Sequence, residues 1–235
     1  QKFKSDREIV MAAVSGYEGF ALAFVDEKFK CDREVVLTAI KSRGDALAYT
    51  NDEEFKSNRE VVLLAVKSWG GALDYADDKF KSDREIVLTA VKSHYLGLQF
   101  VDEKLKADRK IVLEAVMSNG MALEFADDKF KSDREVVLAA VRNDGSAIEY
   151  ADEKFKSDRE VILEAVKFDQ DEVALQYADN ELKIEINKVR SNREVILKAV
   201  KHNGKALRFA DESLHSDHEI VLKAVMSNGF ALEYA

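Results

Sequence analysis

One ten-residue phrase recurs nine times along the chain and restricts its fold more than any other feature. The copy at 132–141 reads SDREVVLAAV. The acidic or amide residue near the start of each copy is one of Asp6, Asp32, Asn58, Asp83, Asp108, Asp133, Asp158, Asn192 and Asp217. The spacings between these residues are 26, 26, 25, 25, 25, 25, 34 and 25. A fixed period of this length is typical of solenoid proteins, in which each repeat packs on its neighbours.

Each copy begins with residues that predict the start of a helix. Ser132 followed by Glu135 has the form of a capping box, with serine as N-cap and Asp133 at the first helical position. The same pair recurs as Ser5/Glu8, Ser57/Glu60, Ser82/Glu85, Ser157/Glu160, Ser191/Glu194 and Ser216/Glu219. In the fifth copy both members change together, to Ala107 and Lys110, as a reciprocal cap predicts.

The end of the same helix is predicted by a glycine about twelve residues later, where a left-handed residue often terminates a helix. These glycines are Gly44, Gly70, Gly120, Gly145, Gly204 and Gly229. The residues that follow, such as Ala122, Leu123 and Phe125, suit a shorter second helix. A DDKFK-like stretch then returns the chain, with its phenylalanine directed inward.

The apolar residues of the first helix cover an arc too wide for a one-sided amphipathic helix. In the copy at 132–141 they are Val136, Val137, Leu138, Ala140 and Val141, and they span roughly 200° of the helical wheel. Such a helix needs neighbours on both sides, and one repeat alone buries too little apolar surface to offset the entropy of ordering it. We therefore predict an all-α fold, an α-solenoid of about nine tandem 25-residue helix-turn-helix repeats. A leucine-rich-repeat horseshoe is the alternative, but its L-x-x-L-x-L-x-x-N signature is absent.

The repeats predict a single continuous array over 1–235, without a proline that would announce a linker. The seventh repeat is enlarged by two residues around Asp169 and Gln170 and by an insertion at 184–190. Neither end carries a recognisable polar capping repeat, so we expect the chain to be part of a longer protein or its ends to dock on neighbours in an assembly.

The phrase DREVVLxAVK, followed by GxALxYA, resembles the tandem repeats of the domain of unknown function family 4116. The resemblance covers essentially the whole chain. The chain departs from the family pattern in repeat four, at Tyr95 and Gly97, and in repeat seven, at the insertion. It implies a repetitive helical protein and supplies no activity.

Composition and charge exclude several classes of function. The formal net charge is −9, and cations are not clustered, which disfavours nucleic-acid binding. No apolar run is long enough to span a membrane, and the start of the chain does not read as a secretory signal. A single cysteine, Cys31, excludes an intrachain disulfide framework and favours a reducing compartment, the cytoplasm or an organelle interior.

Two aromatic columns recur once per repeat, and both are predicted to lie in the core. The first alternates between phenylalanine and tyrosine at Phe24, Tyr49, Tyr75, Phe100, Phe125, Tyr150, Tyr177, Phe209 and Tyr234. The second admits leucine and comprises Phe29, Phe55, Phe80, Leu105, Phe130, Phe155, Leu182 and Leu214. A platform that stacks nucleic-acid bases is the alternative for the first column.

Catalytic, cofactor and metal sites are not indicated. The acidic cluster Asp127, Asp128 and Asp133 is best explained by helix caps and solvated loops, since lysines lie among the carboxylates. His215 and His218 form an H-x-x-H pair without an evident third ligand. The serines fall at cap positions with no recurring histidine beside them, and no phosphate-binding or zinc-protease motif is present. We expect no enzyme activity, no cofactor, no resident metal and no small-molecule substrate.

If the repeated positions serve the fold, function should lie where the repeats differ. The residues on either side of the helix-ending glycine vary most, and stacked repeats would align them in one ridge. Candidate partner-binding residues in this ridge are Phe20, Arg43, Trp69, His94, Met121 and Phe230. The insertion adds Ile184, Ile186 and Val189, which must pack on the next repeat or on a partner. A variable solvated turn remains the alternative for the ridge.

These features together predict a non-catalytic solenoid for protein–protein interaction or scaffolding. A structural accessory subunit of a large multiprotein complex is the alternative. A nucleic-acid-binding repeat array is a third possibility, which the acidic charge disfavours.

Overall fold

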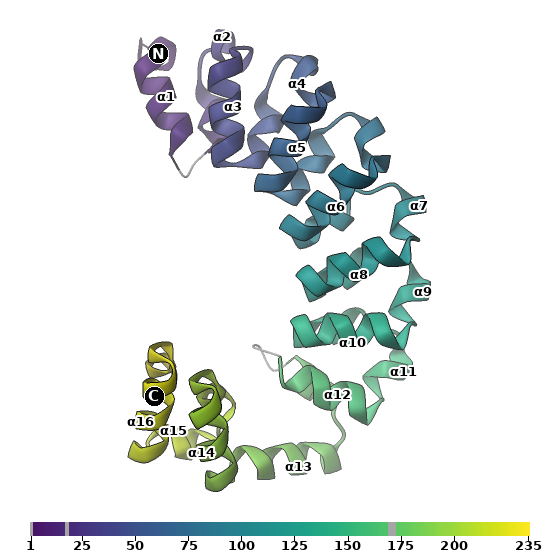
Figure 1. The fold of residues 1–235 in the computed structure, drawn as a ribbon, viewed down its shortest axis with the longest axis vertical. Coiled ribbons are helices and arrows are strands. Elements are labelled where there is room, and N and C mark those ends of the chain that lie inside the picture. The colour runs from purple at the N-terminus through teal and green to yellow at the C-terminus, as the bar shows by residue number, and fades with distance from the viewer. Residues whose placement is uncertain (1, 17–18, 169–172) are drawn as a thin grey trace. The chain divides into compact units, whose positions relative to one another are not determined.

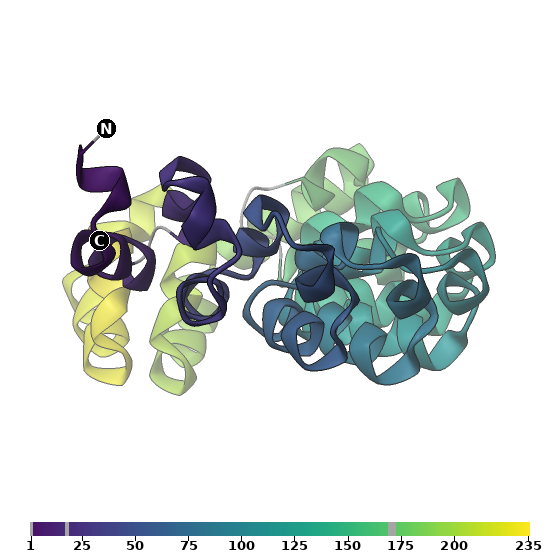
Figure 2. The ribbon, with the colours of Figure 1, turned by 90° about the horizontal axis from the view of Figure 1, so that it is seen from above.

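A computed structural model describes residues 2–16, 19–168 and 173–235. All regular elements in these ranges are helices, and the chain forms two compact units, Gln1–Tyr177 and Ala178–Ala235. Within each unit successive long helices pack side by side, as Figure 1 shows for the first unit from α3 to α10. Figure 2 shows the same helices from above. The predicted all-α fold built from stacked repeats is confirmed.

One long helix opens each repeat, and its N-cap is the acidic or amide residue that marks the repeat in the sequence. In the first unit these helices are α1 (Arg7–Ser15), α3 (Arg33–Ser42), α5 (Arg59–Ser68), α6 (Arg84–Ser93), α8 (Arg109–Ser118), α10 (Arg134–Asn143) and α12 (Arg159–Val166). In the second unit they are α14 (Arg193–His202) and α16 (His218–Ser227). The nine predicted repeat starts therefore coincide with nine helix starts in the described chain.

The predicted capping box is wrong by one residue. In α10 the cap is Asp133, whose Oδ1 accepts the backbone N–H of Glu135 at 2.9 Å and of Val136 at 3.2 Å. Ser132 instead ends the preceding short helix, and its hydroxyl donates to Asp152. The side-chain oxygen of Asp or Asn at this position accepts the first free backbone N–H groups of the long helix, so this residue is the cap. The alternation of Asp and Asn at this position, both of them common N-caps, is the feature of the sequence that indicates the true cap.

A 3₁₀-helix follows each long helix and takes the place of the predicted second helix. These segments are η2 (Gly19–Phe24), η3 (Gly44–Tyr49), η4 (Gly70–Tyr75), η6 (Tyr95–Leu98), η7 (Gly120–Phe125), η8 (Gly145–Tyr150), η9 (Ala174–Tyr177), η10 (Gly204–Phe209) and η11 (Gly229–Tyr234). A short segment then returns the chain to the next long helix. These segments are η1 (Lys2–Ser5), α2 (Glu27–Lys30), α4 (Glu53–Ser57), η5 (Asp78–Ser82), α7 (Glu103–Lys106), α9 (Asp128–Lys131), α11 (Glu153–Lys156) and α15 (Glu212–His215).

Close packing between repeats, and not a left-handed backbone, requires the glycine after the long helix at Gly44, Gly70, Gly120 and Gly204. The long helix α3 ends at Ser42, and the extended backbone of its C-cap Arg43 (φ −154°, ψ 117°) turns the chain into η3. A Cβ on Gly44 would lie 2.2 Å from the carbonyl oxygen of Ala65, in the long helix of the next repeat. A Cβ on Gly120 would lie 2.4 Å from the equivalent oxygen of Ala140. Gly and Ala are therefore paired between successive repeats because the 3₁₀-helix approaches the neighbouring backbone directly.

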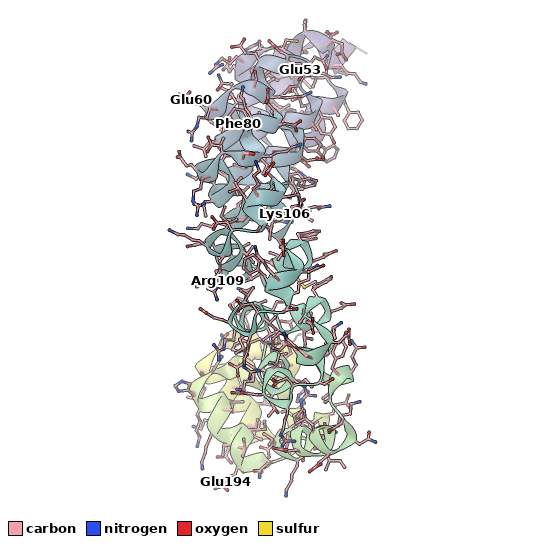
Figure 3. All side chains as sticks on the ribbon, turned by 90° about the vertical axis from the view of Figure 1, so that its right-hand side faces the viewer. Glu53, Glu60, Phe80, Lys106, Arg109 and Glu194 are labelled. Carbon is pink, nitrogen blue, oxygen red and sulfur yellow. The ribbon has the colours of Figure 1, made fainter. Side chains whose placement is uncertain are left out.

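The core is formed by the long helix, by apolar residues of the 3₁₀-helix such as Leu47, and in five repeats by the phenylalanine of the return segment. In α10 the side chains of Val136, Val137, Ala140 and Val141 are completely buried, as predicted, while Leu138 is half-buried. The phenylalanines of the second aromatic column are also buried, for example Phe80 (labelled in Figure 3). Leu105 and Leu214, which replace phenylalanine in this column, are half-buried.

The second unit contains the insertion, which forms part of the helix α13 (Asn180–Arg190) and packs on α14. Leu182 and Ile186, one turn apart, are buried, whereas Ile184 and Val189 are 69% and 50% exposed. The expectation that the apolar insertion is buried therefore holds for one face of α13 only. Asp169 and Gln170, the other enlargement of repeat seven, lie outside the described residues. The core of this unit is built on Ile196, Val200, Leu207, Ile220, Ala224 and Ala231.

Candidate interaction surface

The variable residue that precedes the helix-ending glycine has a structural role in most repeats. The side chain of Asn119 accepts the N–H of Met121 at 3.0 Å and so caps η7. His94 does the same with its Nδ1, which accepts the N–H of Leu96 at 3.3 Å. Asp144, Asn203 and Asn228 cap the following 3₁₀-helix in the same way. The residues of the ridge are therefore more constrained by the fold than their variation in sequence suggests.

Arg43 and Trp69 occupy the same position without capping the 3₁₀-helix. The Arg43 guanidinium binds Asp45, with an Nε–Oδ2 distance of 2.9 Å. Trp69 instead lies across its own turn. A Cβ on Gly71 would lie 2.6 Å from two carbon atoms of the Trp69 ring. The glycine at position 71 therefore provides the space in which the indole is seated.

Five aromatic side chains from three successive repeats form a continuous chain of ring contacts, here called the aromatic strip. Its members are Trp69, Tyr75, His94, Tyr95 and Phe125, and all are half-buried. Trp69 stacks on Tyr75, with ring centroids 6.4 Å apart, and contacts His94 in the next repeat at 6.0 Å. Two further contacts continue the chain, His94 to Tyr95 at 4.6 Å and Tyr95 to Phe125 at 6.3 Å. Two predicted ridge residues, Trp69 and His94, are thus in direct contact.

The prediction that the first aromatic column lies in the core is wrong. None of its nine rings is buried, and Phe24 and Tyr49 are exposed. The apolar residue two positions earlier, such as Leu47 or Leu73, takes the buried place in most of the 3₁₀-helices, although Leu232 in η11 is exposed. Tyr75 and Phe125 were therefore missed as interaction residues, and Tyr95 was noted only as a departure from the repeat pattern. The exchange of phenylalanine and tyrosine was the available signal, since a tyrosine hydroxyl needs water or a polar partner.

The remaining candidates from the sequence do not join the aromatic strip. Phe20 contacts Phe24 edge-on within η2, with ring centroids 6.0 Å apart. Met121 is half-buried in η7, and Phe230 in the second unit is 76% exposed. Ile184 and Val189 are exposed on α13, whereas Ile186 is buried and therefore not available at the surface. Glu18, which the repeat alignment also places in the ridge, lies outside the described residues.

Burial and nearby carboxylates shift the pKa values of several ring side chains. Burial raises the pKa of Tyr75, and the negative charges of Asp74 and Asp45 raise it further. Burial also raises the pKa of Tyr150, and Glu124 and Glu149 add to this effect. Burial lowers the pKa of His94 below 6.5, which keeps its ring neutral and its Nδ1 free to accept a hydrogen bond. Carboxylates therefore act on Tyr75 in the strip and on Tyr150 in η8.

A second recurrent arrangement, here called the arginine ladder, lies at the other end of the long helices. Arg109 (labelled in Figure 3) binds the N-cap Asp133 of the next repeat at 3.4 Å and Glu135 at 2.6 Å. Arg7, Arg59, Arg134 and Arg193 each bind the equivalent two carboxylates. The glutamate of the predicted capping box thus forms an ion pair with the arginine of the preceding repeat. These exposed ion pairs connect successive repeats and leave little charge free for a ligand.

In repeat five the ladder is incomplete because Lys110 replaces the glutamate. Arg84 consequently binds only Asp108, at 2.7 Å. The paired change at Ala107 and Lys110 therefore does not reflect a reciprocal cap. The helix α8 still begins normally, since Asp108 accepts the N–H of Lys110 and Ile111.

The other polar clusters have local structural roles. Asp127 and Asp133 are N-caps, Asp128 pairs with Lys131, and a ring nitrogen of His215 lies 3.1 Å from the carbonyl oxygen of Leu207. In the described ranges, no group of three or more His, Cys, Asp or Glu side chains could hold a metal ion. None of the helices described here is both long and apolar enough to cross a membrane.

A family model matches the chain six times, and the matches overlap. They cover 6–56, 58–106, 83–131, 108–156, 133–183 and 192–235, and the family is described as Domain of unknown function (DUF4116). The chain belongs to this family. No curated protein and no solved structure matches it.

Several matches begin at the N-cap residue of a long helix, for example at Asp83, Asp108 and Asp133. Each of these spans two successive long helices, so the DUF4116 unit contains one complete contact between repeats. This agrees with the Gly–Ala approach and the arginine ladder, both of which join one repeat to the next.

Proposed function

We propose that this DUF4116 protein is a non-catalytic interaction solenoid that binds a partner protein through the aromatic strip. The observation that carries the proposal is the unbroken ring contact from Tyr75 through Trp69, His94 and Tyr95 to Phe125. Half-buried aromatic side chains on a rigid support are typical anchors of protein interfaces, because they bury a large area at a small entropic cost.

Two features distinguish this surface from the rest of the repeat array. The strip depends on residues that differ between repeats, namely Trp69 with Gly71 in repeat three and Tyr95 with Gly97 in repeat four. The framework residues around it recur in repeat after repeat and are explained by packing. Several serine hydroxyls that could suggest nucleophilic chemistry donate to backbone carbonyls or carboxylates, as Ser93 does to Val66 and Ser132 to Asp152.

A structural accessory subunit of a large multiprotein complex is the second candidate. It is favoured by exposed apolar side chains at sites separate from the strip, on α13 at Ile184 and on η11 at Phe230 and Leu232. A subunit held in a large assembly uses several such contacts at once. A nucleic-acid-binding array is disfavoured, because carboxylates flank the exposed rings and the net charge is −9.

The proposal is tested by affinity purification of the whole chain, followed by mass spectrometry and direct binding measurements on the proteins recovered. The test variant combines Trp69→Ala with Tyr95→Ala, and the control is Phe230→Ala, which removes an exposed aromatic ring outside the strip. We expect the double variant to lose partners that the wild type and the control retain. Thermal unfolding of each variant shows whether the fold is intact.

Retention of the same partners by the folded double variant would refute binding through the strip. Loss of partners from Phe230→Ala or Ile184→Ser, with the strip variant unaffected, would favour the subunit alternative.

A further inference from the structure

Three carboxylates accompany the rings of the first unit without forming salt bridges. Asp74, Glu124 and Glu149 each directly precede an aromatic residue of the first column, namely Tyr75, Phe125 and Tyr150. All three side chains are exposed. In the described ranges none of them makes a salt bridge, whereas the carboxylates of the arginine ladder are held by arginines. Their charge is therefore available to a partner.

Two cations close to the strip, Lys56 and Arg43, are already neutralised by neighbours. Lys56 borders Tyr75 in a shallow hollow, but its Nζ lies 2.8 Å from a carboxylate oxygen of Glu53. Arg43 is held by Asp45 in the same turn. The surface that a partner would meet is consequently aromatic and negative, and its charge is not cancelled within the repeat.

This combination fits one kind of side chain better than any other. An arginine guanidinium is planar, stacks on aromatic faces and donates two parallel hydrogen bonds to a carboxylate. A lysine ammonium can satisfy the charge but cannot stack as a plane. Acidic or phosphate-bearing ligands would be repelled by Asp74, Glu124 and Glu149.

We propose that the aromatic strip and its three unpaired carboxylates recognise an arginine-containing basic segment of a partner protein. The inference rests on the proposed function, because it names the chemistry of the partner that the strip binds. In this arrangement guanidinium groups stack on the half-buried rings of the strip and bind the carboxylates of Asp74, Glu124 and Glu149, the last of which lies beside Tyr150 in η8.

The experiment measures binding of fluorescent synthetic peptides to the whole chain by anisotropy. The probes are a peptide of alternating arginine and glycine, the equivalent lysine and glutamate peptides, and a single-stranded oligouridine. We expect the arginine peptide to bind most tightly, the lysine peptide more weakly, and the other two not at all. Binding of the arginine peptide should weaken as salt rises from about 50 to about 500 mM.

The variant Glu124→Gln/Glu149→Gln removes two of the charges and conserves the shape of the surface. We expect it to weaken arginine-peptide binding by about tenfold. The matched control is Glu233→Gln, which changes the carboxylate before Tyr234 in the second unit and should leave the affinity unchanged.

Equal affinity for the arginine and glutamate peptides, or an unchanged affinity in the Glu124→Gln/Glu149→Gln variant, would overturn the inference. So would binding of oligouridine that is lost with Trp69→Ala. A further outcome separates the two proposals. If the Trp69→Ala/Tyr95→Ala variant loses partner proteins in affinity purification but the Glu124→Gln/Glu149→Gln variant retains them, binding through the strip is supported and recognition of arginine is refuted.

Discussion

Gly70 and Ala90 are in direct backbone contact across two repeats. A Cβ on Gly70 would lie 2.1 Å from the carbonyl oxygen of Ala90, well inside van der Waals contact. The same approach joins Gly44 to Ala65, Gly120 to Ala140 and Gly204 to Ala224. The glycine and the backbone of the alanine are thus two halves of one contact, and the glycine must remain without a side chain.

The variant Gly204→Ala is expected to lower the free energy of unfolding by about 1–3 kcal/mol. Its methyl group would lie 2.1 Å from the carbonyl oxygen of Ala224, so the packing of η10 on α16 must open. The matched control is Gly229→Ala, whose Cβ would meet no atom within 4 Å. That variant should be neutral or stabilising by about 0.4–1 kcal/mol, since it reduces the entropy of the unfolded chain. Equal destabilisation in urea unfolding would contradict the packing role of Gly204.

The position of the N-cap is tested in repeat four by comparing Asp83→Ala with Ser82→Ala. Asp83 accepts the N–H of Glu85 at 3.0 Å and of Ile86 at 3.1 Å, and it also binds Arg59. Its loss should cost about 1–2 kcal/mol of stability, measured by chemical unfolding. Ser82 is exposed and caps neither neighbouring helix, so its replacement should change stability by less than about 0.5 kcal/mol. A larger loss of stability in Ser82→Ala than in Asp83→Ala would show that the serine is the cap.

The incomplete ladder in repeat five provides a gain-of-stability prediction. The variant Lys110→Glu supplies the second carboxylate that Arg84 lacks and places a negative charge in the first turn of α8. We expect it to raise the unfolding free energy by a few tenths to about 1 kcal/mol, with a gain that shrinks at high salt. Lys110→Gln is the control, because it removes the lysine without adding a carboxylate. If both variants show the same gain at every salt concentration, Arg84 does not use the new carboxylate.

The folded state around the aromatic strip should lose stability in acid, because His94 then becomes protonated. Burial lowers the pKa of its imidazole below 6.5, so the unfolded chain binds the proton more readily than the folded one. The stability associated with neutral His94 is present above pH 6.5 and is lost as the pH falls through the lowered folded pKa. Protonation also removes the Nδ1 acceptor that caps η6.

The test variant for this effect is His94→Asn, because Asn119 shows that asparagine caps the equivalent turn. Urea unfolding of wild type and variant between pH 7.5 and about 5 should show a steeper loss of stability in the wild type. Parallel pH profiles would show that His94 does not titrate in this range.

The sequence by itself determined the features that depend on one repeat. A helix start needs a capping residue within the same turn, so Asp133 and its counterparts mark the nine long helices, although the sequence pattern favours the serine beside them as the cap. Burial of Val136, Val137, Ala140 and Val141 also follows from the spacing of apolar residues along one helix.

Only the tertiary structure decided which rings reach the surface and which charges are paired. The aromatic column is repeated as regularly as the core, but the Gly–Ala approach sets each 3₁₀-helix so that Leu73 points inward and Tyr75 outward. The partner of Glu135 is Arg109, 26 residues earlier, and Trp69 meets His94 only because two turns are stacked. These relationships join different repeats, and a pattern read along one repeat contains no information about the orientation in which the next repeat packs.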